Sequence, residues 1–186
     1  GRFVIFSGGK AEPRKGQDIV VKAFRIFAQK HPEAMLVTAW HSPWPQLAAG
    51  MDLDLRQFAD RVIDVGAVPN ALMPQVLREC DVALFPNRAE GGTNLVAMEA
   101  IACGLRTILS QNTGHFDLLG YHGTTALRRQ KPSPVWSEWG ESDIEETLDK
   151  LEGAFDRAGW PRTPSEMPLT WSNTAAGLLA AIKEGL

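Results

Sequence analysis

The chain has 186 residues, which fits one domain of roughly 100–200 residues. Apolar residues make up 44% and charged residues 22%, a globular composition that excludes a disordered chain, a collagen-like repeat and a coiled coil. The formal net charge of -3 argues against a nucleic-acid partner, because duplex binding needs a clustered excess of Lys and Arg.

The chain start and the cysteines bear on where the protein works. Gly1 and Arg2 lead directly into an apolar segment without an initiator Met, so we expect the chain to be part of a longer protein. Cys80 and Cys103 each stand in an apolar segment outside any metal-binding cluster, which favours reduced thiols and no metal site. No apolar run approaches the ~18 residues of a transmembrane segment. We expect a cytoplasmic protein, with peripheral membrane association left open for the full-length chain.

Short apolar runs alternate with amphipathic stretches along the first two thirds of the chain. In the first amphipathic stretch, Val20, Phe24 and Phe27 share one helical face. The predicted elements, in chain order, are strand 3–7, helix 17–30, strand 34–40, strand 62–65, helix 70–80, strand 82–85, helix 94–103 and strand 107–110. This order predicts an α/β fold with a Rossmann-like parallel sheet flanked by helices.

The composition changes after Leu127. Residues 128–134, rich in Arg, Lys and Pro, predict an irregular connector. Two helices are expected beyond it, over 143–158 and 172–184. The late tryptophans are expected to pack against these helices; they are Trp136, Trp139, Trp160 and Trp171. We divide the chain into a Rossmann-like core, 1–127, and a connector with C-terminal helices, 128–186, in the same domain.

Ligands of parallel sheets bind in the loops beyond the carboxyl ends of the strands. The first such loop, 7–16, holds three cations and three glycines, including Gly9, Lys10 and Lys15. Glycine lets backbone approach a ligand, and Lys can neutralise phosphate. Taken alone, the loop is equally compatible with a solvated turn. As a surface-loop residue, Lys15 is expected to bind phosphate while contributing little to stability.

The second loop, 86–93, is more informative because it ends where a helix begins. Gly91 and Gly92 expose backbone there, and Thr93 or Asn94 is expected to cap the helix, so its N–H groups favour an anion. Glu99 follows one turn later beside an apolar face, where ribose hydroxyls would satisfy its carboxylate. An acid that merely complements the helix dipole remains an equal alternative for Glu99.

Three stretches together resemble the nucleotide-sugar-binding half of GT-B glycosyltransferases of the retaining, group-one type. They are FSGGK…RKGQDIVVKAF, VGAVPNALMPQVLRECDVALFP and, above all, EGGTNLVAMEAIACG. The resemblance covers about two thirds of the chain, from Phe3 to about Leu119. In that family a pair of glutamates handles the donor sugar and the ribose, and a basic pair in the first loop holds the diphosphate.

The resemblance implies a role for each matching position. Lys15 and Glu90 would be the catalytic residues, and Glu99 would bind the ribose. The implied donor-binding residues are Gly9, Lys10, Lys15, Val68, Gly91, Gly92, Thr93, Asn94, Leu95, Val96 and Glu99. The family separates its two glutamates by seven residues, whereas eight lie between Glu90 and Glu99. Either Glu90 reaches the sugar through a bulged loop, or Gly91 occupies its place.

The implied function is transfer of a sugar from a nucleoside-diphosphate sugar, with retention and without an obligatory metal or cofactor. The acceptor-binding N-terminal domain of that family has no counterpart here, so the isolated chain is expected to bind donor without transferring it. Base, sugar and acceptor stay open. The alternatives are a non-catalytic nucleotide-binding module and a GT-B-like nucleotide-sugar epimerase. His41 and His115 stand at the same sheet edge, and a structural role is favoured for both.

Overall fold

The computed structural model describes residues 1–167 and 170–185 and shows one six-stranded parallel sheet. The strand order is β3-β2-β1-β4-β5-β6. The strands are β1 (Phe3–Lys10), β2 (Ala34–His41), β3 (Val62–Asp64), β4 (Val82–Phe85), β5 (Arg106–Ser110) and β6 (Thr124–Leu127). The predicted α/β, Rossmann-like class is therefore confirmed.

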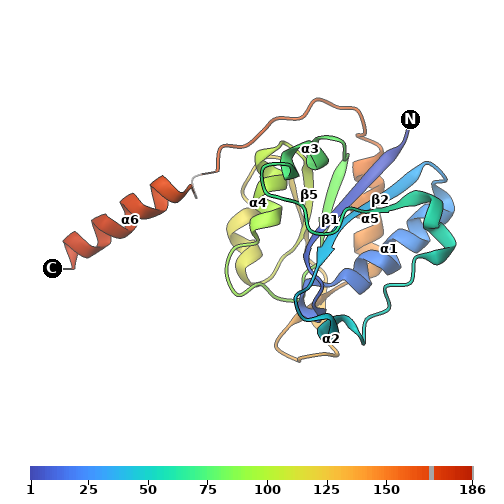
Figure 1. Ribbon diagram of the computed structural model, residues 1–186, viewed down its shortest axis with the longest axis horizontal. Helices are drawn as coiled ribbons and strands as arrows, with labels where there is room; N and C mark the ends of the chain where they lie inside the picture. Colours follow the sequence, from blue (N-terminus) through green and yellow to red (C-terminus); the bar gives the residue numbers. More distant parts are fainter. Residues whose placement is uncertain (168–169, 186) are drawn as a thin grey trace.

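Helices cover both faces of the sheet (Figure 1). On one face α1 (Gln17–Lys30) and α5 (Ile144–Phe155) enclose a core that includes Phe3, Phe24 and Phe27. On the other face α3 (Met73–Arg78) and α4 (Leu95–Ala102) enclose a second core with Phe6 and Phe85. Burial of these aromatic side chains stabilises the packing of the helices on both faces of the sheet.

Helix α1 has the predicted bounds because local signals mark both ends. Gly16 precedes it with φ 69°, a left-handed conformation that favours glycine. Between the ends, Val20, Phe24 and Phe27 are buried on one face, as the 3.6-residue spacing predicts. His31 ends the helix, and Pro32 cannot continue it.

Several other elements differ from the prediction. Helix α3 is shorter than 70–80, and Pro74 stands in its first turn. Strand β6 was not predicted, because its four residues carry two threonines and no apolar run. The predicted irregular connector is wrong in part, since β7 (Gln130–Pro132) and β8 (Gly140–Ser142) form a short antiparallel ladder within and beyond it.

Helix α6 (Trp171–Glu184) agrees with the predicted C-terminal helix but extends away from the sheet (Figure 1). None of its residues is buried. Trp171 is 92% exposed, and Trp136 and Trp160 are also exposed. The expectation that the late tryptophans pack against terminal helices is therefore wrong, although Trp136 and Trp139 stack on each other with ring centroids 5.5 Å apart.

The remaining short helices lie in loops. They are α2 (Pro45–Ala48) and the 3-10 helices η1 (Pro13–Lys15), η2 (Arg56–Arg61) and η3 (Thr113–Leu118). Cys80 and Cys103 are free thiols. In the part of the chain that the structure describes, none of the helices combines the length and the apolarity needed to cross a bilayer.

Gly16, at the end of the first loop, lies close to the backbone just after β4, and its replacement tests this close approach. A Cβ on Gly16 would lie 2.4 Å from the carbonyl oxygen of Pro86. We expect Gly16→Ala to lower the free energy of unfolding by about 2 kcal/mol, from left-handed strain plus overpacking. Gly159→Ala is the matched control, because Gly159 has φ 79° but open space around it. Equal losses in chemical denaturation would show that the close approach to Pro86 costs nothing.

The order of the strands fixes where a ligand would bind. From β1 the chain crosses to β2 on one side, and from β4 it crosses to β5 on the other. The crossovers after β1 and β4 therefore leave in opposite directions, and in parallel sheets the carboxyl edge at such a point is where ligands bind. The loops that the sequence singles out, 7–16 and 86–93, are the loops that follow β1 and β4 at this edge.

Candidate functional site

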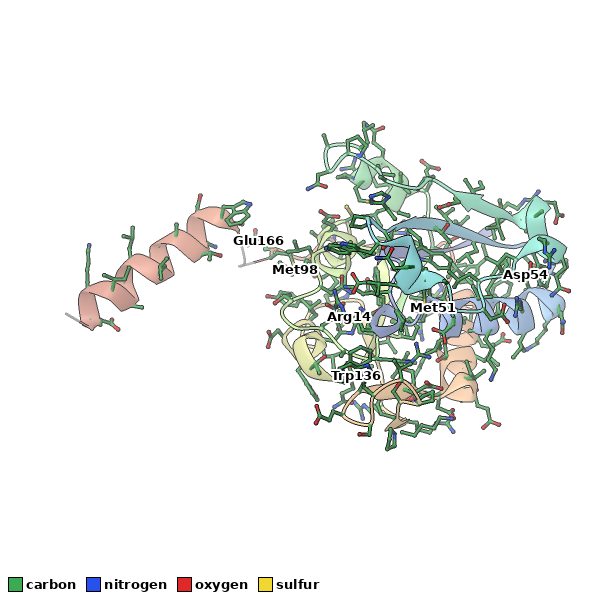
Figure 2. The ribbon with its side chains drawn as sticks, turned by 60° about the horizontal axis from the view of Figure 1, so that its bottom comes forward. Arg14, Met51, Asp54, Met98, Trp136 and Glu166 are labelled. Carbon is green, nitrogen blue, oxygen red and sulfur yellow. The ribbon has the colours of Figure 1, made fainter. Side chains whose placement is uncertain are left out.

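Backbone hydrogen bonds join the two loops at the carboxyl edge. The carbonyl oxygen of Arg14 accepts from the N–H of Arg88 at 2.7 Å and from the N–H of Ala89 at 3.2 Å. Figure 2 turns this end of the sheet toward the viewer and shows Arg14 near its centre, with Trp136 below Arg14 in the view. The first loop is thus held against the second before any ligand arrives.

The carboxylate of Glu90 is the centre of a charged cluster between these loops. One oxygen accepts hydrogen bonds from Nζ of Lys15 and from Nδ2 of Asn87, and the other accepts from Nη1 of Arg14 at 3.1 Å. The side chains of Lys15 and Glu90 are only 12% and 6% exposed. Burial lowers the pKa of Lys15, and the hydrogen bond and charge of Glu90 only partly offset this effect.

The backbone of Glu90 is fixed by the loop that follows β5. Its N–H donates to Oγ1 of Thr113 at 2.7 Å, and its carbonyl accepts from the N–H of Gly114 at 3.3 Å. Thr113 has φ 41°, which is costly for a β-branched residue. A Cβ on Gly114 would lie 1.7 Å from the carbonyl oxygen of Gly92, so only glycine fits there. The strained Thr113 and the close contact between Gly114 and Gly92 hold Glu90 and the glycine turn in place.

His115 is fully buried and fixes the start of α4. Asn94 caps this helix, as predicted, because its Oδ1 accepts from the N–H of Ala97 at 3.3 Å. Its Nδ2 therefore donates to Nε2 of His115 at 3.0 Å, which leaves the ring proton on Nδ1, beside Oγ (2.9 Å) and the carbonyl oxygen (3.3 Å) of Ser110. The structural role favoured for His115 agrees with these bonds.

Burial lowers the pKa of His115 to about 4; the charge of Glu90 acts against this shift, and that of Lys15 adds to it. In the unfolded chain the pKa of His is about 6.5, so between pH 6.5 and 4 the unfolded state binds more protons. Stability should fall as the pH falls through this window, by up to roughly 3 kcal/mol from His115.

His115→Gln keeps an acceptor and a donor but cannot titrate. We expect its unfolding free energy to depend less on pH than that of the unchanged chain between pH 7 and 4, as measured by urea denaturation. Parallel pH profiles for the two proteins would contradict the assignment of this loss to His115.

A groove of about 430 Å³ runs along the first turns of α4. Its lining residues are Asn70, Thr93, Leu95, Met98, Glu99, Trp171 and Thr174. Glu99 is half-buried, and burial raises the pKa of its carboxyl. No side chain or N–H in residues 1–167 and 170–185 donates a hydrogen bond to this carboxylate. Glu99 therefore faces the groove with unused acceptor capacity.

The other positions named from the sequence fall into two sets. Gly91 and Gly92 are exposed, and Leu95 and Val96 form the first turn of α4, where helix geometry leaves N–H groups without intrahelical partners. By contrast, Nζ of Lys10 lies 5.0 Å from the ring centre of Trp44, away from the Glu90 cluster.

Gly9 and Val68 are two further positions named from the sequence. A Cβ on Gly9 would reach Cε of Lys15 at 4.0 Å, so Gly9 borders that side chain. Val68 packs against the core cluster under α3 and α4, apart from Lys15 and Glu90.

Sequence reasoning missed four residues that hold this site. Asn87 and Arg14 bind the Glu90 carboxylate, and Thr113 holds its N–H. Arg88 is buried and forms a two-point ion pair with Asp18, at 2.8 and 2.7 Å. Their common signal is position, since all four stand in loops that leave the carboxyl ends of strands.

In residues 1–167 and 170–185, no three or more His, Cys, Asp or Glu side chains are grouped so that they could hold a metal ion.

The curated proteins that the chain resembles are glycosyltransferases. It is 32% identical over 130 residues to the uncharacterized glycosyltransferase YqgM of Bacillus subtilis (strain 168), covering 68% of this chain and 34% of the relative. It is 27% identical over 194 residues to a D-inositol 3-phosphate glycosyltransferase of Paenarthrobacter aurescens (strain TC1), covering 99% of this chain and 44% of the relative. The chain thus spans less than half the length of these relatives.

Solved structures share the fold. An Anabaena protein, Alr3699/HepE, crystallised in complex with UDP and glucose, matches with a TM-score of 0.65 at 17% identity, over 83% of this chain and 39% of that one. The C-terminal domain of a Francisella tularensis glycosyl transferase group 1 family protein (LpcC) matches with a TM-score of 0.62 at 18% identity, over 84% and 76%. The second match covers most of a separate C-terminal domain.

The family described as "Glycosyl transferases group 1" matches residues 1–133. The family match, the relatives and the parallel sheet agree with one another. The chain belongs to the group 1 glycosyl transferases and has the fold of their C-terminal, GT-B-type domain.

Proposed function

We propose that the chain binds the nucleoside-diphosphate sugar of a retaining glycosyltransferase at the carboxyl edge of the sheet. The observation that carries the proposal is Glu99, a half-buried carboxylate with no donor in the described chain, facing a groove beside a helix N-terminus. Two adjacent ribose hydroxyls supply the donors that such a carboxylate needs.

The diphosphate would lie between Lys15 and the first turn of α4. Lys15 and Arg14 bring positive charge from the first loop, and the N–H groups of Leu95 and Val96 point from the helix N-terminus. When the bond between the sugar carbon and the diphosphate oxygen breaks, these groups stabilise the charge left on the diphosphate. The sugar is transferred to an acceptor hydroxyl, whose proton is released.

The bonds of Glu90 favour one of the two arrangements left open by its spacing from Glu99. Its carboxylate is occupied by Lys15, Arg14 and Asn87, whereas Gly91 is exposed with open space around it. Glu90 would thus act as a positioning residue for Lys15, and the backbone at Gly91 would face the sugar.

Glu99→Gln tests the ribose assignment. The amide fills the same space, so the fold should persist, while the loss of charge-assisted bonds should weaken binding of a nucleoside diphosphate about tenfold in calorimetry. A 2′,3′-dideoxynucleotide is the control, because without the hydroxyls it should bind both proteins equally. If Glu99→Gln weakens the binding of both ligands equally, or of neither, the assignment of Glu99 to the ribose is contradicted.

The activity of the longer protein follows as part of the same proposal. An acceptor-binding domain on a separate stretch of chain would complete the enzyme, so the isolated chain binds donor without transferring it. A non-catalytic nucleotide-binding module is the second candidate, favoured by the engaged Glu90 carboxylate. Calorimetry with a nucleoside diphosphate and with several nucleoside-diphosphate sugars separates the two candidate functions. A non-catalytic module would bind the nucleotide without discriminating between the sugars.

A further inference from the structure

A second groove lies at the opposite, amino edge of the sheet, where β5 and β6 begin. It has a volume of about 320 Å³. The residues that line this groove include Arg106, His122, Thr124, Thr125, Arg157 and Trp160. Arg106 is the first residue of β5 and Thr124 the first of β6. Along β5 this groove is roughly 13 Å from Ser110 at the other edge, so it is separate from the donor site.

Two arginines in this groove have no counterion among the residues that the structure describes. In residues 1–167 and 170–185 no carboxylate forms an ion pair with Arg106 or Arg157. Asp81 is the acid whose charge acts on Arg106, and it already accepts from the N–H of Val4 at 2.8 Å and from Nη2 of Arg162 at 3.3 Å. Burial and the neighbouring charges of Arg157 and Arg162 lower the pKa of Arg106, so the positive charge here is not neutralised.

The wall of the groove is held in place rather than loosely exposed. After α5 the chain crosses the amino edge, and Arg162 fixes it there by donating to the carbonyl oxygen of Arg78 at 3.1 Å as well as to Asp81. This crossing places the indole of Trp160, 59% exposed, beside the two arginines. The groove thus combines guanidinium donors, the Thr125 hydroxyl and an indole N–H, which are all hydrogen-bond donors.

We propose that this groove is a second anion site, which binds a phosphate group between Arg106 and Arg157. A phosphate dianion offers several acceptor oxygens, and guanidinium groups match them with paired hydrogen bonds. Binding would also relieve the repulsion between the two arginines. The phosphate group can belong to a soluble phosphate or to a phospholipid headgroup, and the experiment separates these sources.

The first test is titration of the ¹⁵N-labelled chain with inorganic phosphate at constant ionic strength. We expect saturable shifts at the amides of Thr124 and Thr125 and at the indole N–H of Trp160. Two variants should each weaken the affinity for phosphate, measured from these shifts, about tenfold or more. They are Arg106→Gln and Arg157→Gln, and the latter changes an exposed position that does not threaten folding. Arg129→Gln is the matched control, because Arg129 is exposed and already surrounded by three carboxylates.

The donor site also attracts phosphate, so the location of the shifts decides the outcome. Shifts confined to residues 8–16 and 91–96, non-saturable shifts, or shifts unchanged in both Arg variants would overturn the proposal. In Lys15→Met the shifts at the amino edge should persist even if those at the donor site vanish. Failure of the donor-site proposal would therefore leave this result untouched.

A second arm identifies the source of the phosphate. Vesicles of phosphatidylcholine with phosphatidic acid are sedimented with the chain. Sedimentation that Arg157→Gln abolishes would assign the groove to a lipid phosphate, and no sedimentation alongside saturable phosphate shifts would assign it to a soluble one. Sedimentation that both Arg variants leave unchanged, without phosphate shifts at the groove, would contradict the proposal.

Discussion

Replacing Arg88 by Met is expected to lower the free energy of unfolding by about 3 kcal/mol, the low end of the cost of breaking a buried ion pair. The Arg88 side chain is 4% exposed and binds Asp18 at two points, Glu141 at 3.1 Å and the carbonyl oxygen of Pro13 at 2.7 Å. Met keeps the length of the side chain but leaves these acceptors without their donor. The low end applies because Asp18 and Glu141 are partly exposed.

The chain offers a matched control for Arg88. Arg56 also pairs with an aspartate, Asp54, at 2.6 Å, but its side chain is 91% exposed. Arg56→Met should leave the midpoint of chemical denaturation unchanged, because exposed ion pairs add little to stability. If both variants unfold at the same denaturant concentration as the unchanged chain, Arg88 does not hold the first loop, α1 and β8 together.

Lys15→Met is expected to weaken binding of a nucleoside diphosphate by roughly ten- to a hundredfold, while the affinity for the matching nucleoside stays the same. The difference arises because Lys15 would contact only the phosphates, through charge-assisted bonds. Calorimetry with the two ligands measures it. Equal losses for both would show that Lys15 acts through the fold rather than on phosphate.

The same variant should also lower the free energy of unfolding by about 1–3 kcal/mol, because it leaves the buried Glu90 carboxylate without its Lys15 partner. This differs from the expectation from sequence that Lys15, as a surface-loop residue, contributes little to stability. Combining Lys15→Met with Glu90→Gln should recover part of the stability but none of the phosphate affinity. A double variant less stable than the sum of the single losses would contradict the pairing.

The fold could be predicted because its signals are local. In α1 the spacing of Val20, Phe24 and Phe27 and the residues at each end are all within 15 positions of one another. The N-cap Asn94 is likewise recognisable from the helix that follows it. Strand β6 has no such signal, because its four residues are two threonines followed by Ala126 and Leu127, which form neither an apolar run nor a polar–apolar alternation.

The ion pairs of the candidate site could not be predicted, because the paired residues are far apart in the sequence. Glu90 meets Lys15 across 75 residues, and Arg88 meets Asp18 across 70. The sequence places these residues in loops at one edge but does not say which cation each carboxylate binds. Their pairing depends on the sheet order, which brings β1 next to β4.

Helix α6 has a consequence for how the chain unfolds. Since none of its residues is buried, its hydrogen bonds are supported by little beyond the helix itself, and a helix of 14 residues is marginal on that basis. Its amide protons should therefore exchange with deuterium far faster than those of β1 or β4, which open only with the whole sheet. Far-ultraviolet circular dichroism should accordingly lose helical signal before the cooperative transition begins.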